Sequence, residues 1–184
     1  MFVELQLNLD TREIEENVGL FPVLLNLLCD SDDQVLQQTL SVLAQISAND
    51  RYFHVICVNL LIVFKQHTDL LASRGKLIVE KLCELLGSTK VYMALVDKLV
   101  SEKIIYDDLE FCSLIVQSLN LILLTTDSKT MDELRSNIKN CQSNSDYWKL
   151  FATLFHAWSY NPVASLSLCL LGNVYPLGML VILK

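Results

Sequence analysis

The chain has 184 residues, of which 52% are hydrophobic, with only five glycines and three prolines. This composition predicts one densely packed domain, and abundant leucine with few turn residues favours long helices over strands. The net charge is −7, and residues 1–50 carry nine acids and one base whereas residues 51–184 carry twelve acids and thirteen bases. The acidity is therefore N-terminal, and the absence of clustered Lys and Arg argues against nucleic-acid binding.

Six cysteines are spread along the chain, each at least 26 residues from the next, and no CxxC pair occurs: Cys29, Cys57, Cys83, Cys112, Cys141 and Cys169. Zinc sites need locally paired ligands, and secreted disulfide scaffolds are short and rich in loops. We therefore expect reduced, mostly buried thiols in a cytosolic protein that binds no metal or cofactor. A signal peptide is not predicted, because residues 1–10 lack a basic start and contain Glu4 and Asp10.

Two helices are expected in the first part of the chain. Residues 13–28 form a plausible helix with acids in its first turn, and Pro22 can split it because an interior proline removes a backbone donor. The acidic cluster at 30–33 ends this helix and caps the next. Over 33–48 the apolar residues fall at three-and-four spacing, which predicts a one-sided helix: Val35, Leu36, Leu40, Val42, Leu43 and Ile46.

The run 51–66 is apolar on nearly every face and predicts a helix that is covered on both sides. An outer amphipathic helix followed by a buried inner one is the unit of helical solenoids. Residues 69–86 predict another helix, with Gly87 as its C-cap. A further helix over 89–101 turns four residues inward: Val91, Tyr92, Leu95 and Leu99.

A second inner helix is predicted from Asp108 to Leu124, because its polar residues form only a narrow stripe: Glu110, Ser113, Gln117 and Asn120. Residues 127–141 predict a surface helix with one apolar side, made of Met131, Leu134, Ile138 and Cys141. QSNSD, residues 142–146, is the clearest loop. Together these patterns predict an all-α, HEAT-like helical-repeat solenoid of about eight or nine helices.

An aromatic helix followed by Asn161-Pro162 and a second apolar helix is the most distinctive part of the chain. Aromatic residues recur at helical spacing in the first of these helices: Trp148, Phe151, Phe155 and Trp158. Asn161 can cap the following helix, and Pro162 fits its first position, where no backbone donor is needed. Removing a large aromatic side chain from a core costs about 3–5 kcal/mol, so this corner should matter for stability.

Three runs in this order resemble the C-terminal region of the HEAT-repeat vacuole-morphology scaffolds, which organise the PIKfyve-type phosphoinositide kinase complex on endolysosomal membranes. The runs are FHAWSYNPVASLSLCLL at 155–171, Arg74-Gly75 through Leu82-Cys83, and QSLNLILLT at 117–125. The likeness covers about 27–173. We expect these residues to belong to a single helical-repeat domain spanning 1–173.

The resemblance implies a non-catalytic scaffold. In that family the C-terminal region self-associates and receives a PIKfyve-type lipid kinase and a Sac-family phosphatase, which make and turn over phosphatidylinositol 3,5-bisphosphate. The implied location is cytoplasmic and peripheral on endolysosomal or vacuolar membranes, through the complex. The alternative is a general helical-repeat adaptor with another protein partner, which shares only the architecture.

No catalytic residue is expected, since His156 and Cys169 lack a third, orienting acid. The residues singled out for partner binding or self-association are Arg74, Gly75, Trp148, Phe151, Phe155, Trp158, Asn161, Pro162 and Leu168. Arg74 could contact a partner or pair with a carboxylate such as Asp69. Residue by residue, the aromatic face is expected to be core before it is interface.

The ending departs from the family, which continues after Leu171 with a polar helix, whereas this chain reads GNVYPLGMLVILK. We expect a divergent apolar tail over 174–184 and a product truncated or alternatively spliced at both ends. The 34 residues from Leu150 to Leu183 carry no charged side chain, but Asn161, Pro162, Asn173, Pro176 and Gly178 interrupt any membrane span. Because a solenoid end needs a polar cap, apolar surface near 168–182 should be covered by another copy or exposed.

Overall fold

The computed structural model describes residues 20–183, which form eleven α-helices, two short 3-10 turns and no strand. The helices are α2 (Leu20–Asn26), α3 (Asp33–Ile46), α4 (Asp50–Gln66), α5 (Thr68–Leu86), α6 (Ser88–Ser101), α7 (Lys103–Tyr106), α8 (Leu109–Thr125), α9 (Lys129–Lys139), α10 (Ser145–Trp158), α11 (Pro162–Leu171) and α12 (Tyr175–Ile182). The 3-10 turns are η1 (Leu27–Cys29) and η2 (Cys141–Ser143). The all-α prediction is confirmed.

The predicted number of about eight or nine helices was too low for the described residues. One added helix is α7, a single turn that is too short to show a periodic pattern. The other is α12, which forms from the apolar tail because Pro176 lies in its first turn, where no backbone donor is needed. The expected start of the first helix, residues 13–19, lies outside the described residues.

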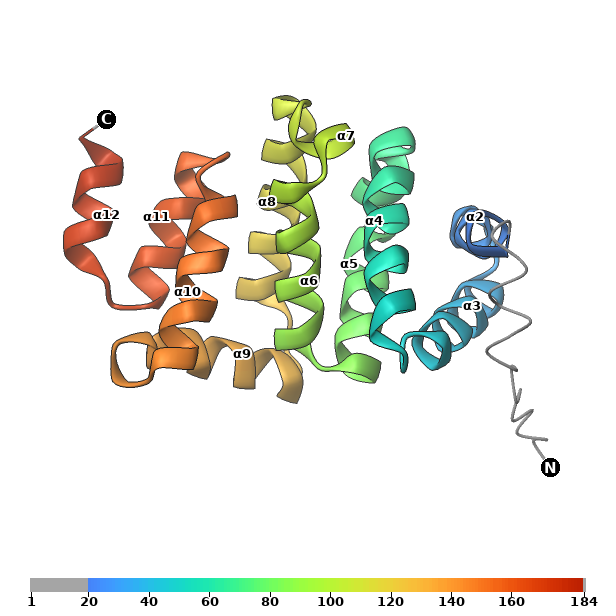
Figure 1. Cartoon of the computed structure of the whole chain (residues 1–184), viewed down its shortest axis with the longest axis horizontal. Helices are drawn as coiled ribbons and strands as arrows, with labels where there is room; N and C mark the ends of the chain where they lie inside the picture. Colours follow the sequence, from blue (N-terminus) through green and yellow to red (C-terminus); the bar gives the residue numbers. More distant parts are fainter. Residues whose placement is uncertain (1–19, 184) are drawn as a thin grey trace.

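The described helices stack as pairs in two layers, with α2, α4, α6 and α10 side by side in one layer and α3, α5, α8 and α11 in the other (Figure 1). Helix α9 crosses the ends of α6, α8 and α10, and α12 packs on α11. Each helix covers its partner in the pair and its neighbour in the next pair. This arrangement is a HEAT-like solenoid, as predicted.

Helix boundaries follow the capping residues that the sequence supplies. At the starts of α3, α4, α8, α9, α10 and α11, the side chain of the N-cap residue accepts a backbone N–H: Asp32, Asn49, Asp108, Ser128, Asn144 and Asn161. Each such cap stabilises a helix by about 1 kcal/mol. Gly87 ends α5 with φ of 88°, a left-handed conformation that glycine adopts without steric cost.

Helix α8 is less covered than an inner helix should be. Leu121 is 59% exposed, and Leu114 and Leu124 are exposed as well. The polar side chains of Ser113 and Asn120 instead form hydrogen bonds with residues of the α10–α11 corner. The prediction of full coverage was therefore wrong, because part of the polar stripe faces protein and part of the apolar surface faces solvent.

One continuous core runs through the stack, and its largest fully buried side chains are Trp158, Tyr92, Phe64 and Phe151. The Tyr92 hydroxyl donates to the Leu119 carbonyl oxygen at 3.0 Å, which ties α6 to α8, and burial raises the pKa of Tyr92 well above its ordinary value. All six cysteines are free thiols, and all but Cys29 are buried, as predicted.

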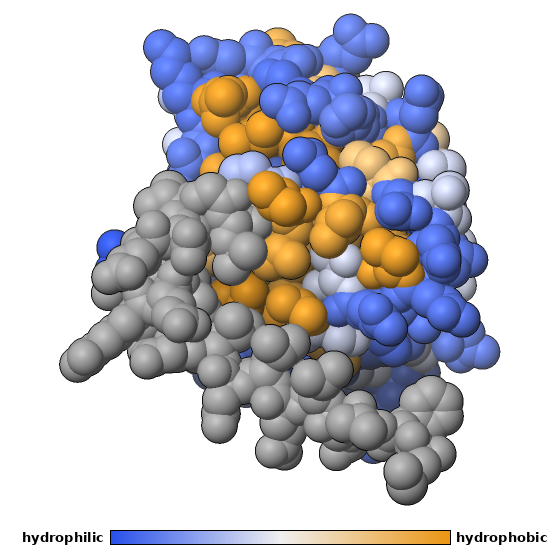
Figure 2. Space-filling view, turned by 90° about the vertical axis from the view of Figure 1, so that its right-hand side faces the viewer, coloured by the Kyte–Doolittle hydropathy of each residue, from blue (hydrophilic) through white to orange (hydrophobic). Residues whose placement is uncertain are grey.

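Apolar surface also lies at the N-terminal end of the described stack. Figure 2 faces this end and shows apolar side chains gathered in its middle, with polar ones around them. Val23 and Leu27 are exposed there. Among residues 20–183, no single helix is both long and apolar enough to cross a membrane, and the one helix pair that passes together, α8 with α9, is bent by 102°.

Candidate interaction surface at the C-terminal corner

A row of aromatic rings follows one face of α10. The ring centroids of Trp148 and Phe151 are 5.6 Å apart and those of Phe151 and Phe155 are 6.1 Å apart, and both pairs are stacked. Residues three and four apart share a helix face, so the sequence spacing accounts for the row. Trp148 is 47% exposed, Phe155 is half-buried and Phe151 is buried, so the row leads from the surface into the core.

Trp158 lies apart from this row and is fully buried between helices. Its indole Nε1–H donates to Asn120 Oδ1 of α8 at 3.0 Å, and the same oxygen accepts from Ser167 Oγ of α11 at 2.9 Å. Ser165 Oγ donates to the Trp158 carbonyl oxygen at 2.7 Å. One amide oxygen therefore joins three helices at the corner.

Asn161 and Pro162 fix the turn between α10 and α11 as predicted. Asn161 Oδ1 accepts the backbone N–H of Ala164 at 3.1 Å, and its Nδ2 donates to Ser113 Oγ of α8 at 3.2 Å. Pro162 is exposed at the start of α11, whereas Leu168 is buried. Asn161 and Leu168 thus shape the corner, and their assignment as partner-binding residues stays a prediction.

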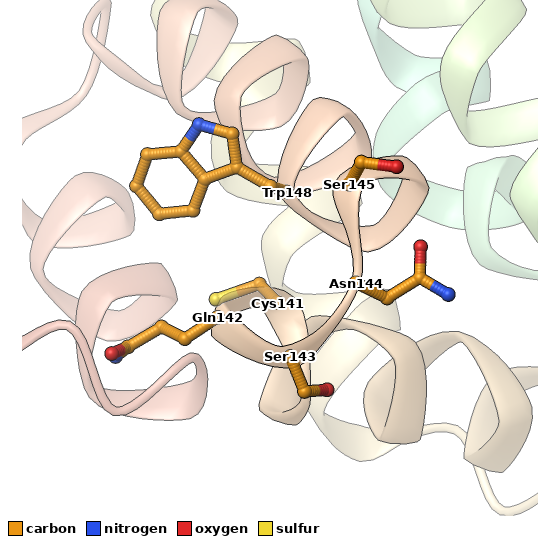
Figure 3. A pocket seen from close by; sticks show the side chains of 6 residues that line it. All are labelled: Cys141, Gln142, Ser143, Asn144, Ser145 and Trp148. Carbon is orange, nitrogen blue, oxygen red and sulfur yellow. The ribbon is translucent and has the colours of Figure 1, made fainter.

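A pocket of about 460 Å³ lies at the turn from η2 to α10 and is lined by residues 141–145 and Trp148. Figure 3 shows the Trp148 indole and the Gln142 side chain projecting toward the same side of this turn. Gln142 Nε2 donates to the Asn173 carbonyl oxygen at 3.2 Å, and Cys141 Sγ donates to the Gly172 carbonyl oxygen at 3.5 Å. These bonds hold the turn against the α11–α12 connection, and they leave the Trp148 ring half-exposed beside it.

The surface beyond this corner is apolar, and we call it the C-terminal patch. It consists of the exposed side chains of α11 and α12: Val163, Leu170, Tyr175, Met179, Leu180 and Ile182. Gly178 lets α12 approach α11 closely, since a Cβ at this position would lie 3.2 Å from the Cβ of Cys169. The expectation of apolar surface over 168–182 is confirmed for the single chain, where Met179 is 56% exposed.

Arg74 and Gly75 lie on α5, away from the corner. The Arg74 guanidinium donates to the carbonyl oxygens of Asp30 and Ser31, and it forms an ion pair with Asp33 at 3.0 Å. Asp69 is not its partner, because residues five apart on a helix point about 140° away from each other. Arg74 therefore holds the α2–α3 turn against α5, and Gly75 is buried in the same helix.

The corner contains no activated nucleophile. Burial raises the pKa of the Cys169 thiol, which favours the unreactive protonated form, and His156 is exposed. Within residues 20–183, no group of three or more His, Cys, Asp or Glu side chains is placed to hold a metal ion.

The sequence alone did not identify Asn120 as the acceptor that joins three helices. The only signal was a single amide within the apolar run LNLILL, which fits a solvent stripe equally well. A side chain with both donor and acceptor groups, placed opposite a tryptophan of a later helix, could have suggested the bond.

A two-layer helical solenoid that ends in an exposed apolar patch defines a helical-repeat protein built for contact with other proteins. Residues 68–184 match the family described as the C-terminal binding region of vacuolar protein 14, and the partner that this description names is a Sac-family phosphatase. Because the match covers more than half of the chain, the chain belongs to this family.

Relatives from plants and fungi agree with this assignment. The chain is 38% identical over 163 residues to the Protein VAC14 homolog of Arabidopsis thaliana, covering 89% of this chain and 21% of that protein. It is 34% identical over 158 residues to the Protein VAC14 homolog of Schizosaccharomyces pombe, covering 85% of this chain and 18% of that protein. It is 29% identical over 171 residues to the Vacuole morphology and inheritance protein 14 of Saccharomyces cerevisiae, covering 92% and 18%.

The chain thus spans about a fifth of the length of these curated relatives. No solved structure matches the chain significantly.

Proposed function

We propose that this chain is a non-catalytic scaffold segment that binds a Sac-family phosphoinositide phosphatase. The observation that carries the proposal is the family match, whose description names the binding of such a phosphatase and whose first residue, Thr68, is also the first residue of α5. The matched part runs from α5 through α12, so it includes the aromatic corner and the C-terminal patch. In this proposal the bound phosphatase works within the complex that makes and turns over phosphatidylinositol 3,5-bisphosphate.

The direct test is co-purification of the chain with a Sac-family phosphatase from a vacuole-bearing organism. The expected result is a stable binary complex in which the phosphatase alone hydrolyses phosphoinositide. A chain that is folded by circular dichroism and yet does not retain the phosphatase would contradict the proposal. A general helical-repeat adaptor, the alternative function, predicts this second outcome.

Self-association and recruitment of a PIKfyve-type lipid kinase complete the proposed scaffold. The C-terminal patch supports self-association, because contiguous exposed apolar side chains mark interfaces between proteins. Such a complex would lie peripherally on endolysosomal or vacuolar membranes through its partners. The relatives named for vacuole morphology support this location.

Light scattering coupled to size-exclusion chromatography tests self-association. We expect a mass above that of one chain that falls on dilution, and a shift toward the monomer for Leu180→Ser. Leu121→Ser on α8 is the matched control, since the two leucines are 60% and 59% exposed and only Leu180 belongs to the patch. A concentration-independent monomer would rule out self-association, and equal effects of the two substitutions would remove the patch from it.

A further inference from the structure

A groove on the layer of α2, α4, α6 and α10 has no role in the function described above. It encloses about 450 Å³ and is lined by residues of α4, α6 and α10. Helix α6 contributes one face to it, through residues at positions i, i+3, i+4 and i+7: Lys90, Met93, Ala94 and Asp97. We call it the α6 groove. None of its lining residues belongs to the C-terminal patch.

The inner part of the α6 groove is apolar. Phe53 and Ala94 are buried and Met93 is half-buried. The Lys90 ammonium lies 4.7 Å from the centroid of the Phe53 ring, in the geometry of a cation–π contact. An apolar side chain of a ligand could therefore occupy the groove without leaving a buried polar group unpaired.

The charges at the groove leave a positive side chain uncompensated. Lys90 Nζ bonds Asp50 Oδ1 at 2.8 Å, and Asp97 lies 3.5 Å from the ammonium of Lys98. Both carboxylates that line the groove therefore have a cation beside them. Lys149 of α10 is exposed, and it forms no ion pair or hydrogen bond through its side chain within the described residues. A ligand that brings its own carboxylate would complement Lys149 and would gain more than a neutral or basic one.

We propose that the α6 groove binds a short acidic segment of a partner protein. An apolar side chain of the segment lies against Phe53 and Met93, and a neighbouring Asp or Glu pairs with Lys149. Layers of a solenoid present such extended surfaces to linear segments. The α6 groove and the C-terminal patch are separate surfaces, so the chain could hold this segment and a second copy at the same time.

Selection of phage-displayed random dodecamer peptides against the full chain tests this inference without assuming the identity of the partner. The enriched peptides are expected to pair Asp or Glu with Leu, Ile, Phe or Trp. The affinity of a synthetic enriched peptide should fall about tenfold or more for Lys149→Glu, because a charge-assisted contact is replaced by repulsion. Lys129→Glu, the same charge reversal at an exposed position of α9 outside the groove, should leave it unchanged.

A second variant separates the apolar contact from the charge. Met93→Gln keeps the length of the side chain and should weaken the same peptide without changing its preference for an acidic residue. Because Met93 and Lys149 are not fully buried, both variants should keep the urea unfolding midpoint of the wild-type chain. Failure to enrich any peptide, enrichment of peptides without acids, or peptides that respond to Met179→Ser but not to Lys149→Glu would each overturn the inference.

Discussion

The hydrogen bond between Trp158 and Asn120 offers a quantitative test of how the corner is held together. Asn120→Ala removes the acceptor and leaves the indole N–H of a fully buried tryptophan unpaired. An unsatisfied buried donor costs about 1–3 kcal/mol of unfolding free energy. Ser167 is little affected by this change, because its hydroxyl also donates to the Ala164 carbonyl oxygen at 2.8 Å.

Trp158→Phe removes the donor instead of the acceptor. The hydrogen bond contributes about 0.5–1.5 kcal/mol, and the smaller ring adds a cavity cost of similar size. The Asn120 amide oxygen is not orphaned, since it still accepts from Ser167. In the double variant no indole N–H remains to be left unpaired, so the total loss should be smaller than the sum of the single losses by about 1 kcal/mol or more.

Urea unfolding followed by far-ultraviolet circular dichroism measures these differences as shifts in the midpoint at constant slope. Ser167→Ala serves as the control, because the Asn120 oxygen keeps its bond to the indole in that variant. Additivity of Asn120→Ala and Trp158→Phe within about 0.3–0.5 kcal/mol would refute the reasoning, because uncoupled sites behave in that way.

Three further predictions follow from individual contacts. Arg74→Ala should cost about 1–3 kcal/mol in urea unfolding, because charged hydrogen bonds to two carbonyl oxygens are lost, whereas Asp69→Asn should have no comparable effect. Gly172→Ala should cost about 1–3 kcal/mol in the same assay, since its Cβ would lie 2.9 Å from an aromatic carbon of the neighbouring phenylalanine. Burial raises the pKa of the Cys57 and Cys83 thiols to about 12 from 9.0, so the unfolded chain loses these protons first. The free energy of unfolding should therefore be unaffected below about pH 9 and fall above it, by up to about 1.4 kcal/mol per pH unit for each thiol, as a pH series of urea midpoints would show.

Local signals explain why the helices could be placed from the sequence. The Asp, Asn and Ser caps and the positive-φ Gly87 act on their own turn of backbone, so they predict boundaries without knowledge of the neighbours. The three-and-four apolar spacing likewise predicted buried faces, for example Met131, Leu134 and Ile138 of α9. Helix α12 was missed because its sequence is apolar all round and has no amphipathic period.

Contacts between residues far apart in the sequence could not be predicted in the same way. Arg74 was expected to pair with Asp69 five residues earlier, and its partners instead lie about forty residues before it, at the turn between α2 and α3. Asn120 was assigned to a solvent stripe, and it bonds Trp158, which is 38 residues later. In both cases the pattern showed a polar group on a helix, but only the stacking of the layers decided what it faces.

Packing at the corner also determines where the C-terminal patch lies. Helix α12 contacts α11, α11 is held to α8 and α10 through Asn120, Ser165 and Asn161, and no ion pair within the described residues joins α12 to the rest. A substitution at Trp158 could therefore displace the patch without touching any of its side chains. Loss of self-association in such a variant would reflect the position of α11 and not a lost contact, whereas Leu180→Ser removes the contact and leaves the corner intact. Comparing the two variants at equal folded fraction separates the surface that binds from the interior that positions it.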